Sequence, residues 1–295
     1  MATSALRWWV KKAARHGVLL SSCVSGSMAI SALMARGPQL RVLTYHRFGN
    51  IPRDPFCVTE ADFDRQIAHL AAAGTAVSLD DLLAFVEGGR KELPRDAVLV
   101  TIDDGFRSTM TIAHEVLRKY GVPAVAFVTP SLVDAGEAAR GARIAGGPEP
   151  YLTWDELRRI ADEGMAIGSH SWTHRSMGSF SLDEAAEEAR RSREALERQL
   201  RRPVLAYAYP YGTRADYSAE IAKRVADAGY KVAFTSQHGP VRPARDLSGL
   251  DALMLPRIKI EAGEGELAFR LATRGGLDAW RLVDHTLWWL QTAQR

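Results

Sequence analysis

Short apolar segments alternate with amphipathic helical patterns along most of the chain. From residue 38 onward, each run rich in Val, Ile, Leu and Ala is followed by a stretch with apolar residues at helical spacing. Runs that are apolar on both faces are typical of parallel strands covered by helices. The alternation predicts an α/β fold, an irregular (β/α)7-8 barrel over residues 38–295. The expected strands are Gln39–Tyr45, Val98–Ile102, Ala124–Val128, Met165–Gly168, Val204–Ala208, Lys231–Thr235 and Leu255–Ile260.

Capping residues mark where several helices begin. Four residues that favour the N-cap are each followed three positions later by an acidic residue, as in a capping box: Thr59, Ser78, Thr153 and Ser181. Further helices are expected at Thr109–Tyr120, Asp216–Ala228 and Leu277–Gln291, the last an amphipathic C-terminal helix. Residues 130–150 are rich in Gly, Ala and Pro and predict a long loop.

The N-terminal part of the chain is strongly basic. Residues 1–53 contain eight Lys and Arg residues and no Asp or Glu, so their formal charge is +8. The whole chain has a formal charge of +3, and the remainder therefore carries −5. Nucleic-acid enzymes more often carry basic charge on the folded domain, so no nucleic-acid partner is expected. Residues 1–37 are interpreted as a helical extension that targets the chain, contacts a membrane surface or packs on the domain through Trp8 and Trp9. A bacterial cell-envelope location is expected, with the cytoplasm as the alternative.

Two adjacent carboxylates, Asp103 and Asp104, follow one of the buried strands and precede Gly105. Like charges this close repel each other, and a bound cation removes the repulsion. The alternative is a polar turn with both side chains in water. The two cysteines of the chain are too few for a cysteine zinc cluster.

Two histidines follow the strand Met165–Gly168. His170 and His174 are spaced i, i+4, which predicts one face of a helical turn from which both rings reach one cation. Two histidines and one carboxylate suit Zn²⁺, or Co, Ni, Mn or Fe as another first-row ion, and leave the second carboxylate available as a general base. The alternative for such a pair is two solvent-exposed surface histidines that bind no metal.

Aromatic residues follow the strand Val204–Ala208 as Tyr209-Pro210-Tyr211-Gly212. Aromatic rings at the rim of a site suit sugar rings, and Pro and Gly fix the backbone so that an N–H can act as an oxyanion donor. The alternative is an aromatic cluster packed beneath the loop.

Together these motifs resemble the polysaccharide deacetylase family, with its NodB-homology fold, over about Gln39 to Ile260. The family motif T-F-D-D-G corresponds to residues 101–105, with Ile102 in place of Phe. The motif H-S/T-x-x-H corresponds to residues 170–174, and P-Y-G to residues 210–212. The sequences around His46 and Arg257 resemble the branch that acts on β-linked N-acetylglucosamine polymers and related exopolysaccharides.

The resemblance implies a hydrolase that removes N-acetyl groups from an N-acetylhexosamine-containing polysaccharide. The resemblance implies that Asp103 is the general base that deprotonates a metal-bound water. The implied metal ligands are Asp104, His170 and His174, and the implied substrate and oxyanion residues are Tyr209, Pro210 and Tyr211, with the Tyr211 N–H as the oxyanion donor.

Two residues of the family pattern have no direct match in this sequence: the arginine that pairs with the base and the histidine that acts as general acid. Ala208 stands where many members have an Arg that pairs with the base, and Arg257 is expected to replace it from another strand end. The family often supplies a His as general acid, for which His46 is the candidate, with buried packing as the alternative. His238 is expected in a solvated turn.

Three functions remain open at this point. The first is the glycan deacetylase. The second is a deformylase or deacetylase of a lipid-linked aminosugar, or another small linear or cyclic amide hydrolase. The third is a glycan-binding protein without turnover, against which the complete Asp and His motifs argue.

Overall fold

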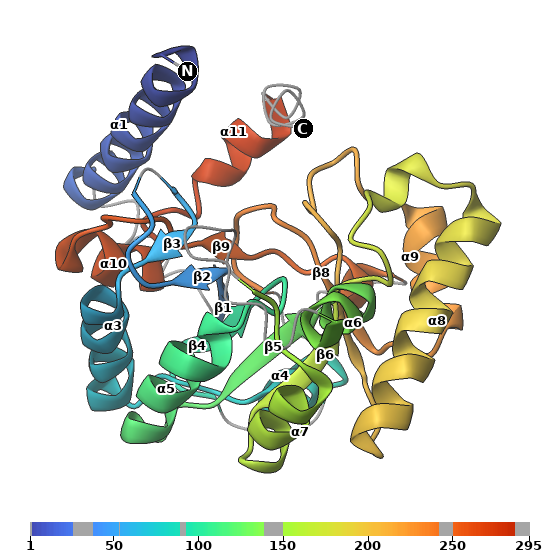
Figure 1. The fold of residues 1–295 in the computed structure, drawn as a ribbon. Helices are drawn as coiled ribbons and strands as arrows, with labels where there is room; N and C mark the ends of the chain where they lie inside the picture. Colours follow the sequence, from blue (N-terminus) through green and yellow to red (C-terminus); the bar gives the residue numbers. More distant parts are fainter. Residues whose placement is uncertain are drawn as a thin grey trace.

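A curled sheet of seven parallel strands forms the centre of the molecule, and helices cover its outer face (Figure 1). The computed structural model describes residues 2–25, 38–52, 54–88, 93–138, 150–241 and 250–286, with side chains from residue 12 onward. The strand order is β8-β7-β6-β5-β4-β1-β9. The strands are β1 (Gln39–Tyr45), β4 (Asp96–Ile102), β5 (Ala124–Val128), β6 (Ala166–Ser169), β7 (Ala206–Ala208), β8 (Val232–Phe234) and β9 (Ile258–Lys259).

The segment that ends in β9 links the two edges of this sheet. Leu255 forms a parallel bridge with Phe234 of β8, whereas Ile258 pairs with Leu43 of β1. The sheet therefore curls into an irregular barrel, and the predicted α/β barrel class is confirmed. A separate pair of two-residue strands, β2 (Arg47–Phe48) and β3 (Cys57–Val58), lies beside the end of β1.

Most helices begin where the sequence predicts. Thr59, Ser78, Thr153 and Ser181 all act as N-caps, and the last three form complete capping boxes. The helices are α1 (Ala2–Val24), α3 (Glu60–Ala73), α4 (Leu79–Val86), α5 (Glu115–Tyr120), α6 (Pro130–Ala138), α7 (Trp154–Asp162), α8 (Leu182–Leu200), α9 (Ala219–Asp227), α10 (Glu266–Thr273) and α11 (Trp280–Thr286). Short turns of other helix types occur at Thr109–His114 (π), Met177–Ser179 and Asp251–Leu253 (3-10).

Alternate strand residues build two separate hydrophobic cores. In β4, Val98, Val100 and Ile102 join the core beneath the surrounding helices, whereas Ala97 and Leu99 join the core inside the barrel together with α4. Successive strand residues point to opposite faces, so this division follows from the period of two. The next inward positions after Leu99 are Thr101 and Asp103, at the mouth of the barrel.

One prediction about these elements is wrong. The stretch 130–150, expected to be a loop, begins with helix α6, because Pro130 is tolerated in a first helical turn and Val133 is buried against the domain. The helix expected at Thr109–Tyr120 starts with a π-helical turn. The C-terminal helix is described only to Thr286, and the remainder of its expected span lies outside the described residues.

The described part of α1 packs against α10, and its buried Arg15 binds the segment between β9 and α10. Arg15 pairs with Glu264 at 2.6 Å and donates to the Lys259 carbonyl oxygen at 2.8 Å. The side chains of Trp8 and Trp9 lie outside the described residues. Among the described helices, none is both long and apolar enough to cross a membrane.

Candidate active site

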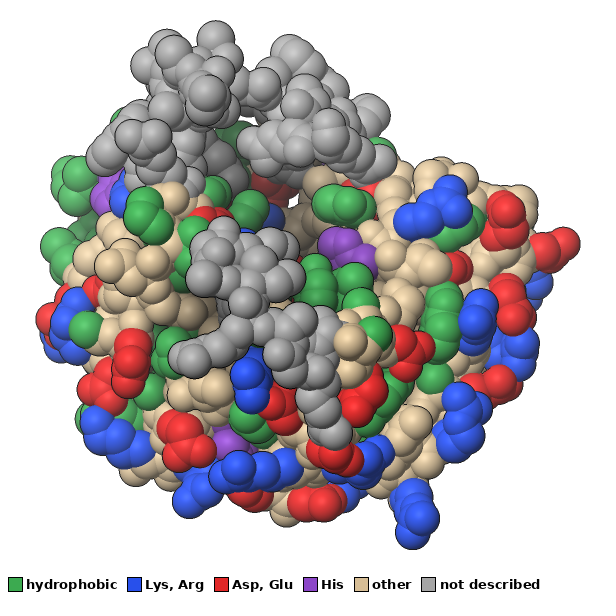
Figure 2. All heavy atoms as spheres, in the orientation of Figure 1, with side chains coloured by type: hydrophobic (Ala, Val, Ile, Leu, Met, Phe, Trp, Pro, Cys, Tyr) green, Lys and Arg blue, Asp and Glu red, His purple; other side chains and the backbone are tan. Residues whose placement is uncertain are grey.

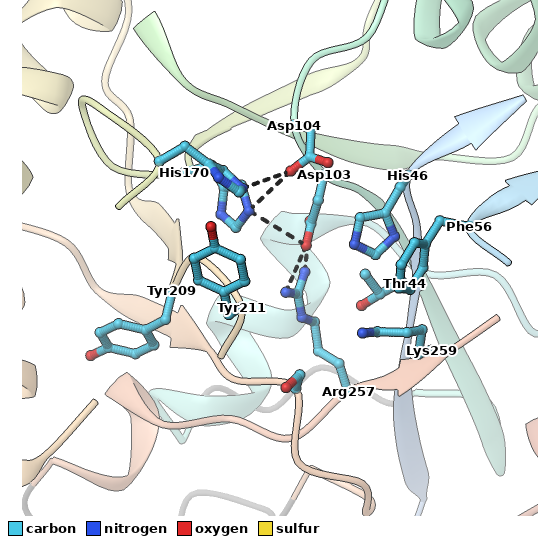
Figure 3. Close-up of a pocket in the computed structure, with 12 residues that line it drawn as sticks. Thr44, His46, Phe56, Asp103, Asp104, His170, Tyr209, Tyr211, Arg257 and Lys259 are labelled. Atoms are coloured by element: carbon cyan, nitrogen blue, oxygen red, sulfur yellow. Dashed lines mark hydrogen bonds and ion pairs between the residues drawn. The ribbon is translucent and has the colours of Figure 1, made fainter. Parts of the chain in front are cut away.

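Residues on the inward face of the strands meet in a pocket at the carboxyl ends of the barrel strands (Figure 3). Each lies at an even spacing from the interior core residues of its own strand, so the strand period directs it inward. On the space-filling surface, hydrophobic side chains border a central hollow in which a histidine is visible (Figure 2). The inward lining residues are Thr44, His46, Asp103, His170, Ser236, Arg257 and Lys259.

Asp104, His170 and His174 form a compact set of possible metal ligands. Their ligand atoms all lie within 4.8 Å of one another. The Asp104 Oδ1 atom is 3.0 Å from His174 Nε2 and 3.4 Å from His170 Nε2. One carboxylate oxygen thus faces both imidazole rings.

The two histidines do not sit on a helical turn, so that prediction is wrong. Ser171 and His174 have φ angles of 62° and 61°, and the loop is held by a hydrogen bond from the His174 N–H to Ser171 Oγ at 3.0 Å. Asp104 also has a positive φ of 74°. Such angles are unfavourable for residues other than glycine and are found preferentially at functional sites.

The donor set fits a divalent cation. His170 Nδ1 lies 2.8 Å from the Ala208 carbonyl oxygen, which can only accept, so Nδ1 carries a proton. Nε2 faces Asp104, and its lone pair becomes available to a metal ion when Nε2 is deprotonated. Metal-binding histidines are typically oriented by this kind of second hydrogen bond. Burial lowers the pKa of His170, but the charges of Asp103 and Asp104 outweigh it and raise the pKa. Carboxylates that favour a proton at this position also favour a metal cation.

The hydrogen bonds of Asp103 come from Arg257, and its contact with His170 is longer. The guanidinium donates to both carboxylate oxygens at 2.8 Å, and both side chains are buried. The expected replacement of the missing third-motif arginine is therefore present as an ion pair. Burial raises the pKa of Asp103, but Arg257 outweighs it, and the net pKa is lowered. Asp103 is consequently an ionised carboxylate at neutral pH, 4.0 Å from His170 Nε2.

His46 lines the pocket as an uncharged imidazole at neutral pH. Burial lowers its pKa to about 4, with Lys259 and Arg257 adding to the effect against the pull of Asp103 and Asp104. Its Nδ1 atom is buried without a hydrogen-bond partner among the described residues. The ring packs against Phe56, with 5.1 Å between centroids. The Phe56 contact is consistent with packing, and the general-acid role of His46 stays a prediction.

The aromatic loop divides between the core and the pocket. Tyr209 is fully buried, stacks on Tyr217 and donates its hydroxyl to the Leu253 carbonyl oxygen, so the expectation of an open sugar platform is wrong for this ring. Tyr211 is 48% exposed and its ring lies 5.3 Å from that of His174. Its φ of 61° shows that the loop turns sharply after Pro210. Both tyrosines line the pocket, and of the two it is Tyr211 whose ring is exposed at the mouth.

His238 is buried, contrary to the expectation of a solvated turn. Its Nδ1 lies 2.9 Å from Asp284 Oδ2 and its Nε2 lies 3.1 Å from Arg15 Nη1. These contacts join α1 and α11 to the loop after β8, so His238 has a structural position away from the pocket.

The pocket also contains four residues that no sequence motif predicted: Lys259, Phe56, Thr44 and Ser236. Lys259 follows Arg257 by two positions in the last strand, so the strand period alone places both on the inward face. Thr44 precedes His46 by two positions and follows the same rule. No sequence signal places Phe56, which reaches the pocket from the loop before β3.

Comparison with known proteins identifies relatives of both sequence and fold. The sequence profile of a family described as Polysaccharide deacetylase matches residues 90–233. YxkH of Bacillus subtilis (strain 168), provisionally named a polysaccharide deacetylase, is 24% identical over 233 residues, which are 78% of this chain and 75% of that protein. The Poly-beta-1,6-N-acetyl-D-glucosamine N-deacetylase of Escherichia coli (strain K12) is 32% identical over 87 residues, which are 28% of this chain but only 13% of that protein.

Two solved structures share the fold. The Streptococcus pyogenes deacetylase PplD, determined in complex with acetate, has a TM-score of 0.68 at 23% identity and covers 81% of this chain and 99% of its own. IcaB from Ammonifex degensii has a TM-score of 0.64 at 23% identity, with 81% and 97% covered. At these identities the likeness establishes the barrel architecture.

Proposed function

We propose that this chain, which carries a polysaccharide deacetylase domain and is a hydrolase of that family, removes N-acetyl groups from an N-acetylhexosamine-containing glycan. One observation carries the proposal: an ionised, arginine-paired carboxylate lies beside a second carboxylate and two histidines in one pocket. Ion pairs and metal-ligand sets each occur in structural roles. Their combination in an accessible pocket is what amide hydrolysis by an activated water requires.

The residues that would hold the metal are Asp104, His170 and His174, with Zn²⁺ as the first ion to test. A divalent ion bound there supplies Lewis acidity toward the acetyl carbonyl and lowers the pKa of a nearby water. The histidine nitrogens and single carboxylate suit Zn²⁺, and they also accommodate Co, Ni, Mn or Fe.

In this proposal Asp103 acts as the general base. Its carboxylate accepts a proton from the attacking water, whose oxygen bonds to the acetyl carbon. The carbon–nitrogen bond then breaks as Asp103 returns that proton to the leaving nitrogen, which gives a free amine and acetic acid; the acid loses its proton to solvent and leaves as acetate. Arg257 keeps the carboxylate ionised and fixed. The Tyr211 backbone N–H is the proposed oxyanion donor, and its exposed ring covers a sugar at the pocket mouth.

The choice of glycan rests on the relatives. The named substrate of the Escherichia coli relative is poly-β-1,6-N-acetyl-D-glucosamine, and it supports testing that polymer and its oligomers first. Acetate release from them, with the metal-loaded protein, is the direct assay. Asp103→Asn should slow release by about 10²–10⁴-fold, whereas Asp80→Asn, at an exposed position on α4, should not change it. Absence of acetate from every N-acetylated glycan, with metal bound, would leave a glycan-binding protein as the better account.

A second candidate is a lipid-linked aminosugar substrate, favoured by exposed apolar side chains near α1. Leu20 is 56% exposed, Leu267 on α10 is 66% exposed and Leu282 on α11 is 62% exposed. Together with the basic N-terminal residues, they support contact with an anionic membrane surface and a cell-envelope location. Co-sedimentation with anionic and neutral vesicles tests the contact, and comparing acetate or formate release from lipid-linked and free aminosugars tests the substrate.

A further inference from the structure

The loop that carries the two histidines has a conformation that its backbone alone does not favour. Ser171 and His174 have φ angles of 62° and 61°, in the left-handed region. Residues other than glycine keep such angles only where the surrounding structure imposes them. Contacts from outside the loop therefore hold residues 170–174 in the form that directs both imidazole rings at Asp104.

Helix α8 supplies such contacts from one of its faces. Glu188 Oε2 accepts hydrogen bonds from the N–H groups of Trp172 at 3.1 Å and Thr173 at 3.0 Å. The Thr173 hydroxyl lies 3.1 Å from both carboxylate oxygens. Ser192, four residues later on the helix, donates to the Ser171 carbonyl oxygen at 3.2 Å. Positions i and i+4 share a helix face, so these two side chains hold consecutive residues of the loop.

The Glu188 carboxylate is committed to this loop. Within the described part of the chain, its hydrogen bonds come from Trp172 and Thr173 alone, and it forms no ion pair. Other acidic residues of α8 pair instead with arginines of the same helix, namely Glu187, Glu194 and Glu197. Successive backbone N–H groups in a turn form a concavity that binds an anion, and Glu188 supplies that anion from within the protein.

Of the two histidines, His174 depends more on the loop backbone. The His170 ring is oriented directly, because its Nδ1 donates to the Ala208 carbonyl oxygen at 2.8 Å. No described residue forms a hydrogen bond with His174 Nδ1, and the His174 ring packs on the rings of His170 and Tyr211, with centroids 4.9 Å and 5.3 Å away. The backbone just before His174, which Glu188 holds, therefore sets how its Nε2 atom faces Asp104.

We propose that Glu188 is a positioning residue that sets the metal affinity of the site through the loop 170–174. The inference rests on the proposed function, because it takes Asp104, His170 and His174 as the metal ligands. Glu188 is not one of the residues that line the pocket, so its effect passes through the hydrogen bonds to Trp172 and Thr173. Loss of a residue that orients metal ligands typically lowers metal affinity about 10–100-fold.

The test measures the zinc affinity of the full chain by competition with a chromophoric chelator. Glu188→Ala should weaken zinc binding about 10–100-fold. Glu188→Gln should retain most of the affinity, because its amide oxygen can accept both N–H groups and its amide nitrogen can donate to the Thr173 hydroxyl. Glu188→Asp keeps the charge but is one methylene shorter, so it should also weaken binding. Glu187→Ala, at the adjacent position with a side chain that is 55% exposed, is the matched control and should bind zinc as the wild type does.

The absorption spectrum of the cobalt-loaded protein separates positioning from a purely structural role. The bands of Co²⁺ depend on the geometry of its ligands. They should change in Glu188→Ala and return toward the wild-type spectrum in Glu188→Gln, at a temperature where circular dichroism shows each variant to be folded. A wild-type spectrum and wild-type zinc affinity in folded Glu188→Ala would overturn the inference.

Equal losses of affinity in Glu188→Ala and Glu188→Gln would also overturn it, since they would assign the effect to charge rather than to hydrogen bonding. If Glu188→Ala does not fold, the other two variants decide: tighter zinc binding by Glu188→Gln than by Glu188→Asp supports the inference, and any other order refutes it. The proposed function is tested separately by acetate release. Glu188-dependent zinc binding without acetate release refutes only the proposed function, whereas acetate release with a zinc affinity that does not depend on Glu188 refutes only this inference.

Discussion

Replacing Arg257 by Met tests the link between the buried ion pair and the proposed base. Charge centres about 4 Å apart attract by about 4 kcal/mol at an effective dielectric constant of about 20. Removing one partner of a buried pair typically destabilises a protein by about 3–5 kcal/mol, because the other charge remains buried. Both side chains here are at most 3% exposed. The free energy of unfolding of Arg257→Met should therefore fall by an amount near the upper end of this range, about 5 kcal/mol. Denaturant unfolding measures it.

The same variant should lose activity in a pH-dependent way. Arg257 is what lowers the pKa of Asp103 against the effect of burial, so its removal leaves burial to raise the pKa. The base is then protonated at neutral pH, and kcat/KM should fall about 100-fold there and recover as the pH rises. The pH also affects the stability of the two proteins. The ionised, paired Asp103 stabilises the wild type at neutral pH, and this contribution is lost as the pH falls through its lowered pKa. The difference in free energy of unfolding between wild type and Arg257→Met should therefore become smaller as the pH falls.

Two controls make this prediction sharp. Arg65→Met removes an arginine whose side chain is 58% exposed and paired with Asp62, and should change unfolding by less than about 0.5 kcal/mol. Metal content should be unchanged in Arg257→Met, because Arg257 does not contact the ligand set. Wild-type kinetics at neutral pH in Arg257→Met would refute the reasoning, and so would loss of the metal.

Three further outcomes are expected. Asp104→Ala should abolish both zinc content and acetate release, whereas Asp103→Asn should keep the zinc and lower kcat by about 10²–10⁴-fold. Atomic emission measures the zinc, and an acetate assay measures the rate. The reverse pattern would show that Asp103 is the ligand and Asp104 the base. Chelation should abolish activity and added Zn²⁺ should restore it; activity of the verified metal-free protein would contradict the proposal. Gly178→Ala should lower the free energy of unfolding by about 1–3 kcal/mol, because the added Cβ would clash with the Ala215 carbonyl oxygen. Gly17→Ala, with no atom within 4 Å of the added Cβ, should be neutral or stabilising. An equal effect of the two glycine changes in differential scanning would show that the close contact does not limit stability.

Local sequence patterns predicted most of the barrel because local physics decides them. β1 and β5 have the expected bounds, and the N-caps of four helices lie where side-chain oxygens precede amphipathic stretches. The helix α6 was missed because its Gly and Ala content resembles a loop, and only burial of Val133 against the domain reveals its stability. The loop conformation of His170 and His174 was also missed, since an i, i+4 spacing does not exclude a turn with positive φ angles.

The sequence alone determined which residues are available for the site and, through the strand period of two, which of them point inward. It determined the adjacent carboxylates, the histidine pair and the strand that carries Arg257. Tertiary structure decided which charges meet, because β4 and β9 are separated by more than 150 residues and both flank β1 in the sheet. That closure places Arg257 on Asp103 and Lys259 at the mouth, and it buries His238 and Tyr209, whose neighbours come from distant segments that no local pattern specifies.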